Sequence, residues 1–204
     1  MAGFTYNKVK ILLLGLAAIV CVFCVSILRS PIPASAMENF DFSDDGTVEK
    51  ILLGDGKLQV LHSERVGSVL FESESGYEAN DFDVGDINND GEIELVIGFW
   101  RFGDFGKELD YQQARRDPKK SYHIYLYKYS EKNDNFYLIW GSSTLPHPIF
   151  NFEIIEKDGQ NILKVDEGTY EDYDNDGEIK SVKTSYWIWN EWWFEEFDEN
   201  LASQ

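Results

Sequence analysis

The chain has 204 residues, of which 37 are acidic and 18 are basic, giving a formal charge of −19. So acidic a surface repels nucleic-acid phosphates and anionic lipids, which argues against nucleic-acid binding. Hydrophobic residues make up 43% and aromatic residues 15% of the sequence, enough for a packed core, so intrinsic disorder is not expected. The length predicts one folded domain after a targeting segment.

The N-terminal segment has the layout of an export signal. Lys8 and Lys10 precede an apolar run, Ile11–Leu28, and the small-residue segment Pro31–Ala36 follows. This order is typical of a secretory signal peptide that is cleaved after its last small residue. The apolar run is also just long enough to span a bilayer, so an uncleaved signal anchor stays open as the alternative. In either case the lysines keep the N-terminus inside and place the rest of the chain outside the cytoplasm.

Residues 1–36 are therefore expected to be a signal peptide or signal anchor, and residues 37–204 the folded domain. The only membrane contact we expect is through the N-terminal segment, if it stays uncleaved. Both cysteines, Cys21 and Cys24, lie in the apolar run. The folded domain thus has no disulfide and would rely on a metal ion or a large core for its stability.

Beyond Met37 the apolar residues alternate with a period of two, and Asp-Gly turn signals recur between the apolar stretches. This pattern predicts an all-β fold of short antiparallel strands, arranged as a sandwich, barrel or propeller. The charged segment Lys107–Arg116 is expected to be an exposed loop. The predicted strands are Val48–Leu53, Lys57–His62, Ser68–Phe71, Ile93–Phe99, Tyr122–Tyr129, Phe136–Trp140, Phe150–Ile155, Asn161–Val165, Val182–Trp189 and Trp192–Phe197.

One acidic loop occurs twice. Asp86–Ile97 repeats the pattern of Asp41–Leu52 at an offset of 86 − 41 = 45 residues. Asp, a polar oxygen, Asp, Gly and Glu recur at relative positions 1, 3, 5, 6 and 9, and an apolar strand follows. Lys157–Gly159 is an eroded third copy, and Asp172–Lys180 is a further loop with a lysine at the ninth position. A strand-forming unit of this spacing has the size of a propeller blade.

The loop pattern suits calcium, which takes six to eight hard oxygen ligands. Acids at alternate positions of a curled loop turn their oxygens inward, and glycine at the sixth position permits the sharp turn. The alternative is an ordinary Asn-Asp-Gly hairpin turn. An EF-hand is excluded, because the twelfth residue, Ile97, lies in a predicted strand. The expected Ca²⁺ ligands are Asp86, Asn88, Asp90, the carbonyl of Glu92, and Glu94, with weaker candidates at Asp41, Ser43, Asp45, Glu49, Asp172, Asp174 and Asp176.

The segment Val84–Gly98 closely resembles the FG-GAP/VCBS repeat, the blade unit of integrin-α-like β-propellers. Tyr186–Phe194 resembles the closing hairpin of small bacterial proteins with such repeats. The resemblance implies calcium-binding loops and a role in adhesion, ligand binding or scaffolding. Only one repeat is intact, and there is room for about three blades, whereas closed propellers usually have about four to eight. We therefore expect a partial or irregular propeller of short antiparallel blades after an N-terminal hydrophobic helix.

The sequence offers little for catalysis. The histidines His62, His123 and His147 lack the spacing of zinc ligands, and no serine lies in a nucleophile elbow. Paired acids such as Glu195 and Glu196 leave a calcium-dependent hydrolase as the alternative function. The first expectation is an exported, non-enzymatic, calcium-binding β domain that binds a protein or a glycan, in part through loops such as 102–120.

Tryptophans cluster near the C-terminus. Trp187 and Trp189 share one face of a predicted strand, whereas Trp192 and Trp193 would point to opposite faces if extended. One face of a half-buried strand points inward, so some of these rings belong to the core. The exposed ones could stack on sugar rings or on a partner.

Overall fold

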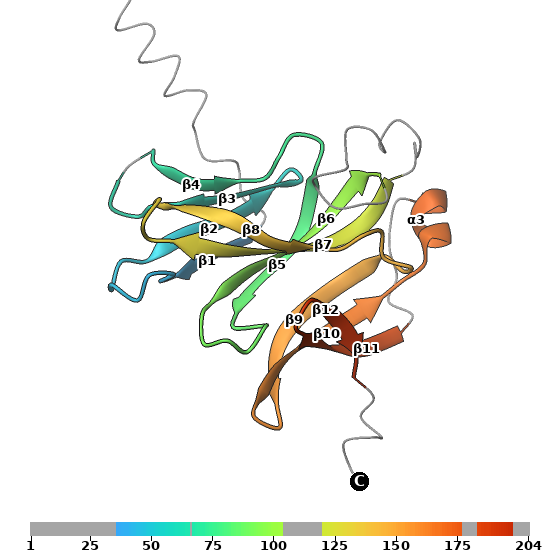
Figure 1. Cartoon of the computed structure of the whole chain (residues 1–204). Coiled ribbons are helices and arrows are strands. Elements are labelled where there is room, and N and C mark those ends of the chain that lie inside the picture. Colours follow the sequence, from blue (N-terminus) through green and yellow to red (C-terminus); the bar gives the residue numbers. More distant parts are fainter. Residues whose placement is uncertain (1–35, 66, 104–119, 177–182, 198–204) are drawn as a thin grey trace, which may run out of the picture.

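The computed structural model describes residues 36–65, 67–103, 120–176 and 183–197 (Figure 1). They form three four-stranded antiparallel sheets, each built from strands that follow one another along the chain. A seven-residue helix, α3 (Tyr170–Asp176), lies between the second and third strands of the last sheet. The strands are β1 (Ala36–Phe40), β2 (Glu49–Gly54), β3 (Lys57–Leu61), β4 (Val69–Glu72), β5 (Glu78–Gly85), β6 (Glu94–Phe102), β7 (Lys120–Ser130), β8 (Asn135–Gly141), β9 (Ile149–Lys157), β10 (Gln160–Glu167), β11 (Lys183–Asn190) and β12 (Trp193–Glu196).

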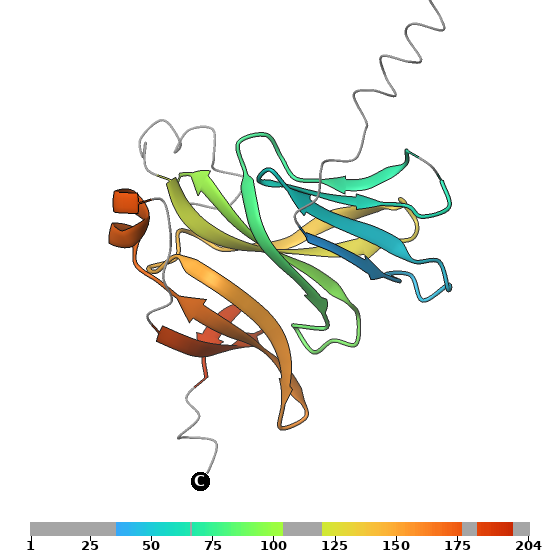
Figure 2. The same ribbon diagram turned by 180° about the vertical axis from the view of Figure 1, so that it is seen from behind.

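The middle sheet, β5–β8, lies between the other two and shares a core with each (Figures 1 and 2). Successive side chains of a strand point to opposite faces. On β6, Leu95 and Ile97 therefore join the core with the first sheet, and Val96 and Trp100 join the core with the third. Because both faces are covered, β6 and β7 are buried along almost their whole length.

Gly98 is the one residue of β6 that carries no side chain, and the packing of the third sheet explains why. A Cβ at this position would overlap the hydroxyl of Tyr122 on β7 and lie 3.1 Å from the ring of Phe152 on β9. Glycine here lets two large aromatic side chains pack against the backbone of β6.

Two aspartates join the middle sheet to the third. Asp81 Oδ2 accepts a hydrogen bond from Phe152 N (3.1 Å), and Asp83 Oδ2 accepts one from Ile154 N (2.6 Å). Both carboxylates lie on β5, an edge strand, and both amides lie on β9, the edge strand of the third sheet. Burial raises the pKa of Asp81 to about 6 and raises that of Asp83 as well. The aspartates thus satisfy amides of an exposed edge, which would otherwise be open to pairing with another chain.

The predicted strands are confirmed in type and order, and the fold is all-β. Two strands were missed, β1 and β5. Both strands contain more polar residues than a typical strand. The acids of β5 point at the edge of a neighbouring sheet, and a contact of this kind is not visible in the alternation of apolar and polar residues along the sequence. The expected N-terminal hydrophobic helix and the loop Lys107–Arg116 lie outside the described residues. Within the described ranges, no helix is both long and apolar enough to cross a membrane.

Candidate functional site

The Asp86 loop, residues 86–94, joins β5 to β6, and hydrogen bonds between its own side chains and its backbone hold it in a curled conformation. Asp86 accepts two backbone hydrogen bonds, from Asp90 N to Oδ1 and from Gly91 N to Oδ2, both 2.9 Å long. Asn89 and Gly91 take left-handed φ values of 58° and 88°, which the predicted glycine at the sixth position makes possible. The loop therefore has the curled path that the spacing of its acids predicted.

Glu94 closes the loop from the first position of β6. Its side chain is fully buried, with Oε2 accepting a hydrogen bond from Ile87 N (3.2 Å) and Oε1 accepting one from Asn88 Nδ2 (3.1 Å). Burial raises the pKa of Glu94 to about 7, although its interaction with Lys128 opposes the rise. A buried carboxylate of this kind needs a cation beside it.

Lys128 supplies that positive charge from the neighbouring strand. It stands directly across from Glu94 in the β6–β7 register. Its Nζ lies 2.8 Å from Asp90 Oδ2, 2.8 Å from Glu92 Oε2 and 3.1 Å from Glu94 Oε1, and its side chain is 10% exposed. Burial opposes the charge, but the hydrogen bonds to these three carboxylates together raise the pKa of Lys128 above its ordinary value.

Sequence reasoning missed Lys128. It also assigned the backbone carbonyl of Glu92 to a metal, whereas the structure brings the Glu92 carboxylate to the lysine. Among the described residues, no three acidic or histidine side chains are disposed as they stand to hold a metal ion. Two of the carboxylates predicted to bind calcium, those of Asp90 and Glu94, contact the Lys128 ammonium, whereas the Asp86 carboxylate accepts hydrogen bonds from the backbone of the loop.

The Asp41 loop, residues 41–49, joins β1 to β2 and repeats part of the hydrogen-bond pattern of the Asp86 loop. Asp41 Oδ2 accepts a hydrogen bond from Gly46 N (2.8 Å), and Glu49 Oε2 accepts one from Phe42 N (3.2 Å), each matching a bond in the Asp86 loop. Ser43 donates to Asp41 Oδ1. The internal repeat of the sequence therefore extends to individual hydrogen bonds.

One further hydrogen bond of the Asp41 loop also has a counterpart in the Asp86 loop. Asp45 Oδ1 accepts from Thr47 N (2.7 Å), as Asp90 Oδ1 accepts from Glu92 N (2.9 Å). The β2–β3 register ends at the pair Lys50–Leu61, and the next residue after β3, where the Asp86 loop has Lys128 across from it, is His62. The two loops thus share their fold but differ in the side chain that faces them from the next strand.

The two other predicted loops are different structures. Asp158 and Gly159 form a tight turn between β9 and β10, with φ values of 54° and 78°. Asp172, Asp174 and Asp176 lie in helix α3 and not in a curled loop, while the rest of the expected loop, residues 177–180, lies outside the described residues. Thr169 caps the N-terminus of the helix: its Oγ1 accepts a hydrogen bond from Asp172 N (3.2 Å), and it also donates one to Asp172 Oδ2 (2.9 Å).

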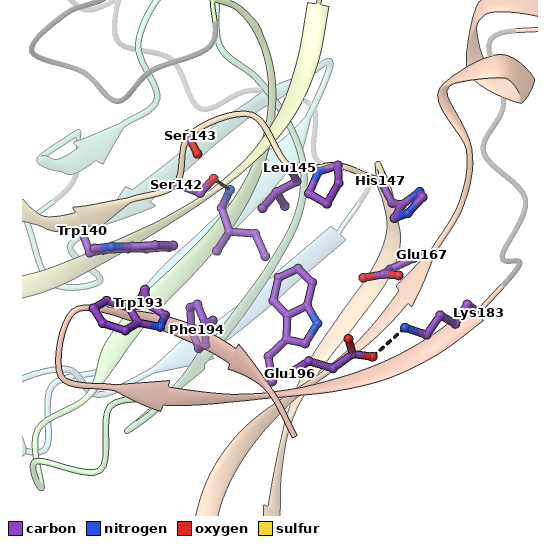
Figure 3. A pocket seen from close by; sticks show the side chains of 13 residues that line it. Trp140, Ser142, Ser143, Leu145, His147, Glu167, Lys183, Trp193, Phe194 and Glu196 are labelled. Atoms are coloured by element: carbon purple, nitrogen blue, oxygen red, sulfur yellow. Dashed lines mark hydrogen bonds and ion pairs between the residues drawn. The ribbon is translucent and has the colours of Figure 1, made fainter. Parts of the chain in front are cut away.

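A pocket of about 480 Å³ lies between the end of β8 and the β11–β12 hairpin (Figure 3). Figure 3 shows Trp140, Trp193 and Phe194 at one end and His147, Glu167 and Lys183 at the other. Its walls also include Trp187 and Glu196. The pocket thus combines aromatic faces with hydrogen-bonding groups of both charges.

The polar end of this aromatic pocket is held by specific contacts. Lys183 Nζ pairs with Glu196 Oε1 at 2.6 Å, and Glu167 Oε1 accepts a hydrogen bond from Ser185 Oγ at 3.1 Å. Ser185 Oγ also accepts from Trp187 Nε1 (3.1 Å), which fixes that indole. The Lys183–Glu196 pair is more than half exposed on both sides, so a ligand can rearrange it at little cost.

The tryptophans divide as expected between core and surface. Trp187 and Trp189 both pack against the core shared with the middle sheet, which confirms that they share a face. Trp192 and Trp193 are 72% and 51% exposed. Only the second of these two neighbours lines the pocket.

One serine and one histidine meet on β7. Ser121 Oγ lies 3.0 Å from His123 Nε2, and His123 Nδ1 lies 3.1 Å from the carbonyl of Ser142. Burial, with the nearby Arg101 guanidinium, lowers the pKa of His123 to about 4. Such a pair has the atoms of a nucleophile and a base, but both side chains are buried, at 6% and 0% exposure. The contacts tie β7 to the segment after β8.

Comparison with known proteins gives no match: no protein-family model matches the chain, and no curated protein does.

Proposed function

We propose that the chain is an exported, non-enzymatic β domain that binds a glycan in the aromatic pocket. The observation that carries this proposal is the meeting of Trp140, Trp187, Trp193 and Phe194 with carboxylate, ammonium and imidazole groups in one cavity. Sugars present apolar C–H faces that stack on aromatic rings, and hydroxyls that need both donors and acceptors. A concave pocket of this size suits a small ligand or a chain end better than a protein surface.

The exposed neighbours Trp192 and Trp193 allow a matched test of glycan binding. The full chain would be screened on a glycan array, and binding of the best ligand measured by titration calorimetry. Loss of a stacked ring costs about 1 kcal/mol or more, so Trp193→Ala should weaken binding at least about fivefold. Trp192→Ala should leave it unchanged, because Trp192 lies outside the pocket lining. Equal effects of the two substitutions, or capture of a protein alone through this face, would contradict the proposal.

The second candidate is a hydrolase that acts in the same aromatic pocket. Its support is that two carboxylates, Glu167 and Glu196, line one cavity beside aromatic rings, as glycoside hydrolysis requires. Binding without turnover is favoured, because one of the two carboxylates, Glu167, is buried and already accepts a hydrogen bond from Ser185. Incubation of the bound glycan with the protein decides between them. Hydrolysis that both Glu167→Gln and Glu196→Gln abolish would make the chain an enzyme.

Location and architecture complete the proposal. The export segment 1–36 supports a position outside the cytoplasm, secreted or membrane-anchored, and cell fractionation tests this. Three consecutive four-stranded sheets, two of which join their first and second strands by the same acidic loop, support an open, blade-like arrangement related to FG-GAP/VCBS repeats. Calcium is proposed as an accessory ion of the Asp86 loop. Millimolar calcium should then raise the melting temperature, and Asp90→Asn should remove that rise.

A further inference from the structure

Lys128 occupies the place of a cation in the Asp86 loop. Its ammonium contacts three carboxylates at 2.8–3.1 Å, two of which, Asp90 and Glu94, belong to the expected metal ligands. We propose that Lys128 is the built-in cation of this loop, so that the loop folds without calcium. Calcium binds there only by displacing the Lys128 ammonium. This proposal does not depend on what binds in the aromatic pocket.

The charges of the loop explain why a cation is needed at all. Asp86, Asp90, Glu92 and Glu94 bring four carboxyl groups within nine residues, and Glu94 is fully buried. Leaving one buried carboxylate without a partner is strongly destabilising. A lysine fixed to the adjacent strand meets this need whatever the ion content of the surroundings, whereas a bound metal does so only above its dissociation constant.

The backbone fixes Lys128 at the loop, and an adjoining cavity gives its side chain somewhere to go. Lys128 is held opposite Glu94 by the β6–β7 ladder, so only the side chain can move. A second pocket of about 480 Å³ is lined by Lys128, by Gly91 and Glu92 of the loop, and by Phe42 and Asp44 of the Asp41 loop. This cavity offers a path for an incoming ion and room for a displaced ammonium.

The Asp41 loop provides an internal comparison. Its backbone and acids are arranged alike, but the residue across the strand is His62, whose Nδ1 accepts a hydrogen bond from Glu64 N (3.2 Å). The imidazole thus makes its hydrogen bond within its own turn, whereas the ammonium of Lys128 contacts three carboxylates of the loop directly. The built-in cation is a feature of the Asp86 loop and not a general consequence of the repeat.

The test replaces Lys128 by methionine, an unbranched side chain one atom shorter than lysine, which keeps the apolar stem and removes the charge. Melting curves of the full chain are recorded with chelator and across a calcium titration, and calcium affinity is measured by calorimetry. The wild type should melt at the same temperature in chelator and in buffer without added calcium, and should bind calcium only in the millimolar range. Lys128→Met should lose stability in chelator, regain it with calcium, and bind calcium at least about tenfold more tightly. A nearby positive charge opposes a divalent ion by roughly this factor or more.

Two further variants locate the effect. Lys164→Met removes another ion-paired lysine, 2.6 Å from Glu153 on the third sheet, and should not change calcium affinity. Lys128→Met combined with Asp90→Asn should lose the gain in affinity, because Asp90 is shared by the lysine and the expected metal site. A gain that survives in this double variant means that calcium binds elsewhere, and the proposal fails.

The wild type alone can also overturn the proposal. Unfolding in chelator, or calcium affinity in the micromolar range, would show that the loop depends on calcium despite its lysine. If Lys128→Met does not fold with or without calcium, Lys128→Arg keeps the charge and should resist chelator as the wild type does. Failure of Lys128→Met to gain affinity, with folding intact, would refute the competition directly.

Discussion

Asp81 should make the stability of the domain depend on pH, and Asp81→Asn should remove that dependence. The side chain accepts hydrogen bonds from Phe152 N across the sheet joint and from Phe82 N within β5. The amide oxygen of asparagine can replace one of these acceptors without carrying a charge. The substitution therefore separates the charge of Asp81 from its hydrogen bonding.

The sign follows from the direction of the pKa shift. Burial raises the pKa of Asp81 from 3.8 to about 6 in the folded state, so folding favours the protonated form. The free energy of unfolding contributed by this group is largest below pH about 4 and falls as the pH rises to about 6. Two pKa units correspond to at most about 3 kcal/mol, and solvent screening will reduce this figure. Asp83 contributes in the same direction.

The assay is urea unfolding at several pH values from 4 to 8. Wild type and Asp81→Asn are compared at each pH, so that carboxylates shifted in the opposite direction cancel in the difference. The variant should gain on the wild type by about 1–3 kcal/mol between pH 4 and 7 and be at least as stable above pH 7. Asp166→Asn, which changes a half-buried carboxylate bonded to Thr184 on the third sheet, is the matched control. A constant difference across the range, or a loss that grows with pH, would refute the reasoning.

Three further substitutions test the packing. Gly98→Ala should destabilise the domain by about 1–3 kcal/mol in urea unfolding, because its Cβ would overlap the Tyr122 hydroxyl; an unchanged unfolding midpoint would contradict this packing. Thr169→Ala should cost about 1 kcal/mol by removing the cap of α3, and Thr169→Ser should restore most of it. Asn161→Ala removes a 2.8 Å bond to the Asp86 carbonyl and should speed amide exchange in the Asp86 loop; unchanged exchange would count against that tie.

The sequence predicted the strands whose apolar residues alternate or run continuously, since those patterns arise from burial on one face or two. It did not predict β5, because Asp81 and Asp83 resemble loop residues until the edge of β9 is placed beside them. It predicted a loop at Asp172 where the structure has a helix, because a Thr169 cap and an Asp-rich turn begin with the same kinds of residue.

The Asp86 loop was predicted because its bonds are local, spanning two to seven residues. Lys128 was not, because it lies 38 residues from Asp90 and reaches the loop only through the register of β6 and β7. The aromatic pocket was not predicted for the same reason, since Trp140 and Trp193 are far apart in the sequence and belong to different sheets. Long-range register is the information that one sequence does not contain.

The polar joints between the sheets point to one principle of construction. From residue 37 onward the chain has no cysteine, so no disulfide links the sheets. Carboxylate-to-amide bonds join β5 to β9, and Asn89 joins the Asp86 loop to the start of β10 by exchanging two hydrogen bonds with Asn161. Unneutralised negative charge in the Asp86 loop would therefore also destabilise the contact between the middle and third sheets. Lys128 carries the positive charge that neutralises the loop acids, and it belongs to β7 of the same middle sheet. For this reason we expect the Lys128 side chain, more than a diffusible ion, to stabilise the contact between the Asp86 loop and the third sheet.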